Sequence, residues 1–333
     1  MPNYNILSID GGGMKGLISA IVIEQLEKEI KQYSGNESAH ISDYFDLIAG
    51  TSTGSILTGI YLCPDSYGRI KYTASDAVKL YQDHGKEIFT HKRCYGLKSL
   101  YGLHRSKYSN GNLSSLLNEY FGLVKLSHLR KPCLIPAYDI ETGSAFFFNT
   151  ISAKEDSDDD FYLKDAVLAS AAAPTYFPPV LVESITHQKL CMVDGGISCN
   201  NPSMCAFVEA IKMPHYTSVD QVNIFSVGNI SKEISYACKY TKKWGLIDWF
   251  NPLLHIFMDA NKQTVDYQLK MLYDSMKNKD NYLRIEKIAE NSHDIPDMDD
   301  ASPKAMEYLT MIGHELITTY EDEIKAFAKK IVS

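Results

Sequence analysis

A serine flanked by glycines is the residue of this chain whose setting most suits chemistry. Residues 50–54 have the sequence Gly-Thr-Ser-Thr-Gly, with Ser52 at the centre. The segment before them, 43–49, predicts a short buried strand, and 55–62 predicts the start of a helix. A tight turn of this kind exposes the serine hydroxyl at the positive end of a helix and needs Gly50 and Gly54 for space. The alternative is a glycine-rich loop with a buried serine.

A second glycine-rich segment, 10–16, lies between the first predicted strand and the first predicted helix. Gly11, Gly12 and Gly13 allow backbone N–H groups to face one point, so an anionic group is expected there. A dinucleotide pyrophosphate and the oxyanion of an acyl transfer are the two candidates. The first needs an acidic residue at the end of a second strand about 20 positions later. Glu37 has no apolar strand before it, which disfavours the dinucleotide.

A third motif places an aspartate at the end of a predicted strand. The apolar segment 190–193 is followed by Asp194, Gly195 and Gly196. Because ligands bind at the carboxyl ends of parallel strands, we expect Asp194 to meet Ser52 and the glycine loop there. The alternative is an aspartate that only caps the turn through the two glycines.

Strands and helices alternate along the rest of the chain. This pattern predicts an α/β fold, a three-layer sandwich with a mostly parallel central sheet, in a single domain spanning residues 1–333. The predicted strands are 4–10, 133–138, 145–148, 180–183, 190–193 and 222–227. The predicted helices are 16–32, 74–86, 112–120, 163–172, 202–211, 256–272 and 303–331.

Composition excludes several classes of protein. The net charge of −8 argues against a nucleic-acid binder, and no apolar run approaches the ~20 residues of a membrane span. No secretory signal is visible at the N-terminus, and the seven scattered cysteines predict reduced thiols, so a cytoplasmic protein is expected. Neither Cys199 with Cys205 nor the acidic segment 155–160 has the spacing of a metal site. We therefore expect no metal.

In their order, the three motifs resemble those of the patatin-like phospholipase family. The family pattern is D-G-G-G-x-[RK]-G, then G-x-S-x-G, then D-G-[GA], and the likeness continues through most of the chain. Further similar segments are 169–179, 200–202, 244–245, 264–268 and 312–313. Two positions depart from the pattern: Lys15 stands where arginine is commoner, and 226–229 is Ser-Val-Gly-Asn where a Gly-Thr-Gly-like turn is frequent.

The resemblance implies a lipid acyl hydrolase that acts on membrane phospholipids without a cofactor. It implies a Ser–Asp dyad, with Ser52 as nucleophile and Asp194 as general base. The implied oxyanion hole comprises Gly11, Gly12, Gly13 and Lys15, and the motif glycines are Gly50, Gly54, Gly195 and Gly196. A Ser-His-Asp triad is the rival mechanism. It is disfavoured because none of the histidines after Asp194 lies at a clear strand-end loop; these are His215, His255 and His314.

Contacts with other molecules are less defined by the sequence. The segment 86–108 combines six basic with four aromatic residues and could touch anionic headgroups, giving a peripheral membrane protein. A solvated surface segment is the simpler interpretation. An idle storage or binding protein on the same fold is an alternative function, as is a defence phospholipase activated by a small nucleotide. The sequence does not define the oligomeric state, and a homo-oligomer is one alternative.

Overall fold

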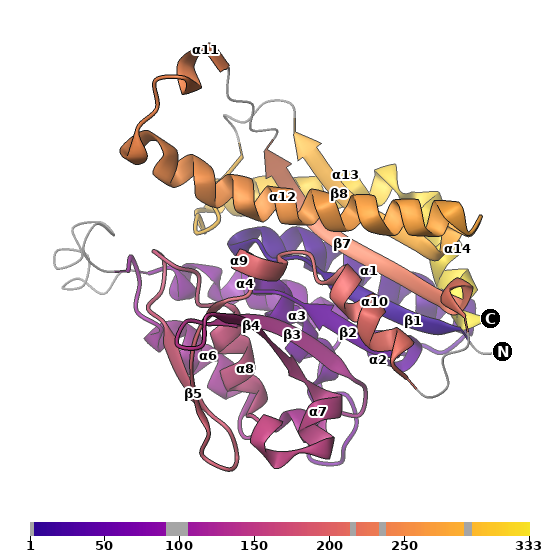
Figure 1. Cartoon of the computed structure of the whole chain (residues 1–333). Helices are drawn as coiled ribbons and strands as arrows, with labels where there is room; N and C mark the ends of the chain where they lie inside the picture. The colour runs from indigo at the N-terminus through magenta and orange to yellow at the C-terminus, as the bar shows by residue number, and fades with distance from the viewer. Residues whose placement is uncertain (1–2, 91–105, 214–217, 233–237, 290–294) are drawn as a thin grey trace.

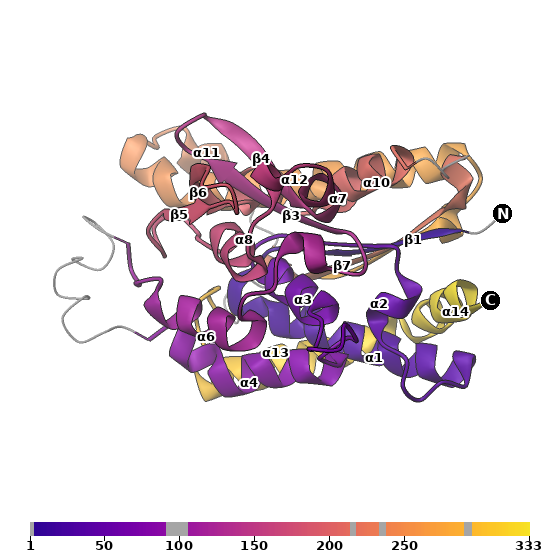
Figure 2. The ribbon, with the colours of Figure 1, turned by 90° about the horizontal axis from the view of Figure 1, so that it is seen from below.

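A central sheet of eight strands carries helices on both of its faces (Figures 1 and 2). The computed structural model describes residues 3–90, 106–213, 218–232, 238–289 and 295–333. The strands are β1 Tyr4–Ile9, β2 Leu47–Gly50, β3 Cys133–Asp139, β4 Ser144–Asn149, β5 Val180–Glu183, β6 Lys189–Asp194, β7 Val222–Lys232 and β8 Tyr282–Ala289. Strands β3, β2, β1, β7 and β8 are mutually parallel, whereas β4, β5 and β6 pair antiparallel. The predicted α/β sandwich with a mostly parallel sheet is confirmed.

Two strands share one edge of β3. Leu134 pairs with Ala49 of β2 and also with Asn149 of β4, so β2 and β4 lie on opposite edges of β3. Farther along, Ala137 pairs with Asp194 of β6 and again with β4 on the other edge. Strands β2 and β6 therefore lie end to end on the same edge of β3. Since β6 runs in the opposite direction, the carboxyl ends of the two strands point toward each other.

The helices form two layers (Figure 2). On one face, buried side chains of α10 and α12, such as Phe207 and Leu269, pack on Ile6 and Ile224 of the sheet. The larger core lies on the other face, under α1, α3, α4, α6, α8, α13 and α14. Their bounds are α1 Gly16–Ser34, α3 Thr53–Leu62, α4 Ala74–Ile88, α6 Gly111–Phe121, α8 Leu163–Ser170, α10 Ser203–Ile211, α12 Leu246–Ser275, α13 Pro303–Thr319 and α14 Glu321–Val332. Shorter helices are α2 Ile41–Tyr44, α7 Thr150–Glu155, α9 Gly196–Cys199 and α11 Cys238–Thr241.

Two predicted elements were wrong in kind or extent. The expected strand 43–49 begins instead as the one-turn helix α2, because the Asp43 carboxylate accepts the N–H of His40 at 2.9 Å and caps the turn. Only Leu47–Gly50 is strand. The expected helix 303–331 is two helices, because the backbone leaves the helical conformation at Tyr320.

Other differences concern β8 and α12. The sequence interpretation missed β8, since its buried residues include Arg284, which breaks the apolar alternation expected of a strand. Helix α12 begins ten residues before the predicted start, at Leu246, where the Asp248 carboxylate accepts the Gly245 N–H. Among the described helices, none combines the length and apolar character needed to cross a bilayer.

Candidate active site

Ser52 lies in a strained turn between β2 and α3. Its φ of 54° and ψ of −120° are sparsely populated for a residue with a side chain, as expected for a nucleophile elbow. A Cβ on Gly50 would lie 2.1 Å from the Gly54 carbonyl oxygen, and one on Gly54 would lie 2.3 Å from the Ile9 carbonyl oxygen. Glycine is therefore needed on both sides of the serine because a side chain at either position would collide with a backbone carbonyl. Helix α3 starts at Thr53, so its positive end adjoins the serine.

Asp194 reaches Ser52 from the opposite direction. The expectation that β6 would run parallel to its neighbour was wrong, because β6 pairs antiparallel with β3. The two side chains still meet, since β2 and β6 end toward each other on the same edge of β3. Ser170 of α8 fills the gap between the strand ends: its hydroxyl accepts the Ser52 N–H at 3.0 Å and donates to the Pro136 carbonyl at 2.6 Å.

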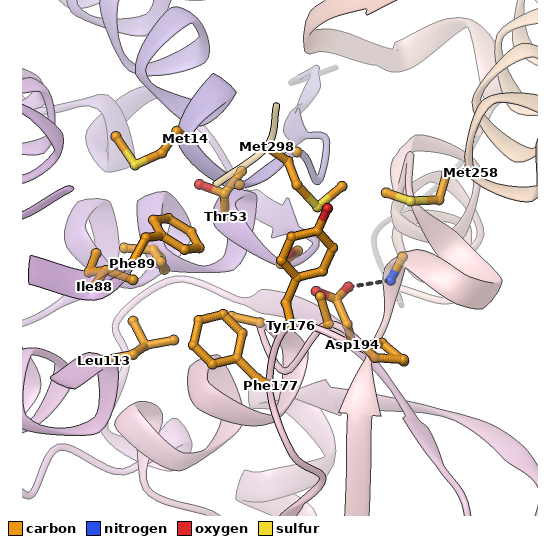
Figure 3. Close-up of a pocket in the computed structure, with 18 of the residues that line it drawn as sticks. Met14, Thr53, Ile88, Phe89, Leu113, Tyr176, Phe177, Asp194, Met258 and Met298 are labelled. Atoms are coloured by element: carbon orange, nitrogen blue, oxygen red, sulfur yellow. Dashed lines mark hydrogen bonds between the residues drawn. The ribbon is translucent and has the colours of Figure 1, made fainter. Parts of the chain in front are cut away.

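The Asp194 carboxyl is buried, and its pKa is raised. Burial raises its pKa to about 6, and hydrogen bonds from the Ser52 side chain and the Gly196 N–H partly offset this rise. The Gly196 N–H donates to Asp194 Oδ1 at 2.7 Å, which orients the carboxylate (dashed line in Figure 3). Gly195 is needed for close packing, because its Cβ would lie 2.2 Å from the Pro136 carbonyl oxygen. A carboxylate with this pKa is a stronger base than an ordinary aspartate.

The glycine loop provides two unused amides. Among the described residues, no acceptor pairs with the N–H of Gly12 or Gly13, and both glycines line the same hollow as Ser52. The N–H of Gly11 is different, because it donates to the Asn200 carbonyl at 3.1 Å. Gly11 thus serves to hold the loop, and two of the three predicted amides remain for an oxyanion. Gly13 has a φ of 60°, and a Cβ there would lie 2.2 Å from the Met298 carbonyl oxygen.

A buried arginine that the sequence interpretation missed anchors this loop. Arg284 of β8 donates to both carboxylate oxygens of Asp10, at 2.8 Å through Nη1, and Asp10 is fully buried. The same guanidinium donates to Ser226 and Glu286. The bidentate pair fixes the carboxylate at the start of the loop. A charged residue at an inward position of a strand was the signal available in the sequence.

Ser52 and Asp194 line an apolar pocket, which we call the acyl pocket (Figure 3). Its walls come from several elements and are dominated by methionine, aromatic and aliphatic side chains. They include Met14, Ile56, Ile88, Phe89, Leu113, Tyr176, Phe177, Met258 and Met298. In Figure 3, Ile88, Phe89 and Leu113 lie at the end of the pocket away from Asp194. The pocket therefore offers an elongated apolar space next to a serine hydroxyl.

Other candidate residues lie elsewhere. Lys15 lines a neighbouring polar hollow and is not among the residues around the acyl pocket. His314 is exposed on α13, His215 lies outside the described residues, and the side chain of His255 is likewise not described. No histidine is among the described residues that line the acyl pocket. In the part of the chain that the structure describes, no group of three or more metal-binding side chains is found.

Two further predictions from the sequence concern residues 226–229 and the basic, aromatic segment 86–108. Asn229 lies within β7, in the stretch 226–229 that departs from the family pattern, and it donates its amide to the Gly11 carbonyl at 3.0 Å and so supports the glycine loop. Residues 91–105, the middle of the segment expected to touch headgroups, lie outside the described ranges. The membrane contact expected of that segment stays a prediction.

Comparison with known proteins identifies the family of this chain. A protein-family model described as Patatin-like phospholipase matches residues 7–206, which include all three motifs. Patatin-like protein 4 of Arabidopsis thaliana is 30% identical over 94% of this chain and 83% of its own length. Probable inactive patatin-3-Kuras 1 of Solanum tuberosum is 30% identical over 97% of this chain and 91% of its own. From the matched motifs and the extent of these alignments, the chain belongs to the patatin-like phospholipase family.

Proposed function

We propose that this protein is a lipid acyl hydrolase of the phospholipase A type, which cleaves fatty acyl esters of glycerophospholipids. One observation carries the proposal. The hydroxyl of Ser52, a residue with a strained backbone, adjoins the buried carboxyl of Asp194, whose pKa is raised, in the wall of an apolar pocket. Two unused backbone amides line the same pocket. These are the parts that an acyl transfer to serine requires.

In the first half of the proposed reaction, Ser52 Oγ attacks the ester carbonyl carbon while its proton passes to the Asp194 carboxylate. The carbonyl oxygen becomes an oxyanion and accepts the N–H groups of Gly12 and Gly13, each worth about 10²–10³-fold in turnover. The intermediate then collapses: the ester C–O bond breaks, and Asp194 returns the proton to the departing lysophospholipid oxygen. The acyl group remains on Ser52 as an ester.

In the second half, water replaces the alcohol. Asp194 takes a proton from a water molecule, whose oxygen attacks the acyl-serine carbonyl. The second oxyanion uses the same two amides, and its collapse returns the proton to Ser52 and releases the fatty acid. Asp194 can serve in both steps without a histidine, because its pKa of about 6 allows the carboxylate to predominate near neutral pH while remaining a useful base.

The walls of the acyl pocket suit a fatty acyl chain. Methionine and aromatic side chains adapt to a flexible alkyl chain, and burial of each CH₂ group contributes about 0.8 kcal/mol to binding. Met14, Phe89 and Phe177 lie along this space (Figure 3). A small polar substrate would gain little from such walls, so a long-chain ester is favoured.

The direct experiment compares Ser52→Ala and Asp194→Asn with the unmodified protein on defined phospholipids, with released fatty acid and lysolipid identified by mass spectrometry. Each variant should lose at least about 10³-fold in kcat/KM, because each removes a group that acts in the transition state. His314→Ala is the matched control and should retain activity. Full activity in Ser52→Ala would contradict the proposal.

The pH dependence gives a second test of Asp194. Because the carboxylate is the active form, kcat/KM should decline about tenfold per pH unit below about pH 6. A profile that is flat down to pH 4 in a folded protein would exclude Asp194 as the base.

A catalytically idle binding protein is the second candidate, and a relative with 30% identity carries the word inactive in its name. Labelling with a fluorophosphonate probe separates the two, since only an activated serine reacts. We expect labelling of the unmodified protein and none of Ser52→Ala.

A further inference from the structure

A polar hollow lies directly beside the acyl pocket, and we call it the polar pocket. Four residues line both, namely Gly12, Tyr176, Met258 and Met298. The other walls of the polar pocket differ in kind: they include two lysines and two aspartates, which are Lys15, Lys262, Asp259 and Asp297. A ligand that places an ester at Ser52 can therefore extend past Gly12 from apolar into charged surroundings.

The buried part of the polar pocket holds the ammonium of Lys262, which is paired with Asp259. Only 8% of this residue is exposed, and its ammonium donates to Ser231 Oγ at 2.6 Å and lies 2.9 Å from Asp259 Oδ1. A lysine carries three N–H donors, so one remains after these two contacts. Lys262 also acts electrostatically on Asp10, the residue that starts the glycine loop. This ammonium therefore lies near the start of the glycine loop.

The polar pocket also contains a buried hydrogen-bond acceptor that no donor of the described residues reaches. Asn200 is 1% exposed and lines the polar pocket, and its Oδ1 has no hydrogen-bond partner among the described residues. Leaving such a buried acceptor unpaired is unfavourable, so a bound molecule or water that donates to it is favoured. The pocket therefore has polar groups that its own walls leave unsatisfied.

The outer part of the polar pocket is anionic at Asp297. This residue is exposed, and among the described residues its carboxylate makes no hydrogen bond or ion pair. The order from inside to outside is a buried ammonium and then an exposed carboxylate. In a zwitterionic phospholipid the order from the ester outward is a phosphate and then an ammonium. The charges of pocket and headgroup are complementary in that order.

Resting on the function proposed above, we propose that the polar pocket binds the zwitterionic headgroup of the phospholipid whose ester Ser52 attacks, with Lys262 facing the phosphate and Asp297 facing the ammonium group. With two lysines and two aspartates, the lining carries no net charge, which matches a headgroup of no net charge. An anionic headgroup lacks a partner for Asp297 and is repelled by it. The protein should accordingly prefer zwitterionic over anionic phospholipids.

The test compares substrates that share acyl chains and differ in headgroup. In mixed micelles, phosphatidylcholine and phosphatidylglycerol report the headgroup, while diacylglycerol and p-nitrophenyl butyrate report the Ser52 chemistry alone. Lys262→Gln should lower kcat/KM for phosphatidylcholine at least about tenfold and change the two headgroup-free esters less than about threefold. Lys270→Gln, an exposed lysine of the same helix paired with Asp266, is the matched control and should change nothing.

A second variant covers the case in which Lys262→Gln fails to fold. Asp297→Lys alters an exposed position and should lower activity on phosphatidylcholine while raising it on phosphatidylglycerol. Equal loss on all four esters, or no change on any, would overturn the headgroup assignment while leaving the esterase proposal intact.

Binding to the Ser52→Ala variant tests the pocket without catalysis. Calorimetric titration with glycerophosphocholine should give saturable binding that Lys262→Gln and Asp297→Lys each weaken at least about fivefold. Adenosine 5′-monophosphate carries a phosphate monoester in place of the headgroup phosphodiester and lacks the ammonium group, so it should bind no more tightly than glycerophosphocholine. Absence of glycerophosphocholine binding, or a clear preference for the nucleotide, would overturn the assignment even in a protein that hydrolyses no ester.

Discussion

Strands β2 and β6 deliver Ser52 and Asp194 in different ways. Strand β2 belongs to the parallel part of the sheet, and its serine is placed by a local turn whose glycines contact one another. Strand β6 belongs to the antiparallel part, and its aspartate is placed by its register against β3. Short-range geometry therefore sets one half of the site, and long-range strand pairing sets the other.

This comparison implies different sensitivities. The turn at Ser52 depends mainly on residues close to it in sequence, such as Gly50 and Gly54, together with one long-range hydrogen bond from the Ser52 N–H to Ser170. The position of Asp194 depends on segments far apart in the chain, including β3 and α8, which hold the two strand ends at the right separation. Five substitutions test these dependencies.

The largest effect is expected at the buried ion pair of the parallel part. Arg284→Met leaves the Asp10 carboxylate buried without its cation, which should lower the free energy of unfolding by about 3–5 kcal/mol. Urea denaturation followed by circular dichroism measures the change. Lys287→Met on the same strand removes an ion pair with the exposed Glu315 and should cost less than about 1 kcal/mol. Equal effects of the two would mean that Arg284 does not anchor the loop.

The next effect concerns the cost of keeping Asp194 charged. Its folded-state pKa of about 6 lies above the 3.8 that is usual for an aspartate, so the folded state holds this proton more tightly than the unfolded chain. The contribution of Asp194 to stability is therefore greatest below about pH 4 and is lost as the pH rises through about 6. At pH 8 the penalty is about 3 kcal/mol. Asp194→Asn should thus be more stable than the unmodified protein at pH 8.

The gain in Asp194→Asn should shrink as the pH falls from 8 to 4, and urea denaturation at several pH values measures it. A gain that stays constant over this range would show that packing, and not the buried charge, is responsible. The same variant is expected to be inactive, so the site gains its chemistry at a cost in stability.

A smaller effect is expected from matched glycine substitutions at the two strand ends. Gly54→Ala and Gly195→Ala each place a Cβ 2.2–2.3 Å from a backbone carbonyl oxygen that belongs to the sheet. Each should cost about 1–3 kcal/mol in unfolding free energy, because backbone cannot move aside cheaply. Gly85→Ala in α4 meets only the flexible end of Met14 at 2.4 Å and serves as the control with a lower cost. If Gly85→Ala lowered the unfolding free energy more than the other two variants, close contact with backbone atoms would not be the cause of the cost.

The smallest effect is expected at the link between the two ends. Ser170→Ala removes the hydroxyl that accepts the Ser52 N–H and donates to Pro136, which should cost about 1 kcal/mol of stability. Thermal unfolding monitors the change, with Ser275→Ala at an exposed helix end as the control. An unchanged melting temperature would show that the gap between β2 and β6 needs no such link.

Much of the fold was predictable because its signals are local. The 3.6-residue periodicity of α1 and α4, and the glycines of the turn at Ser52, depend on residues a few positions apart. The strand expected at 43–49 failed for a local reason too, since a capping aspartate at Asp43 stabilises a helical turn. The resemblance in the motif order added the family and the functional expectation, and the comparison with known proteins confirmed the family.

Local patterns in the sequence were enough to name the residues proposed for the site: a serine that needs glycines around it, an aspartate before two glycines, and a loop of three glycines. Only the tertiary structure decided how they meet, because the direction of β6, the pairing of Asp10 with Arg284 and the use of the Gly11 amide by Asn200 depend on segments more than 50 residues apart. Such contacts arise from the packing of whole elements in the core, and no short stretch of chain encodes them.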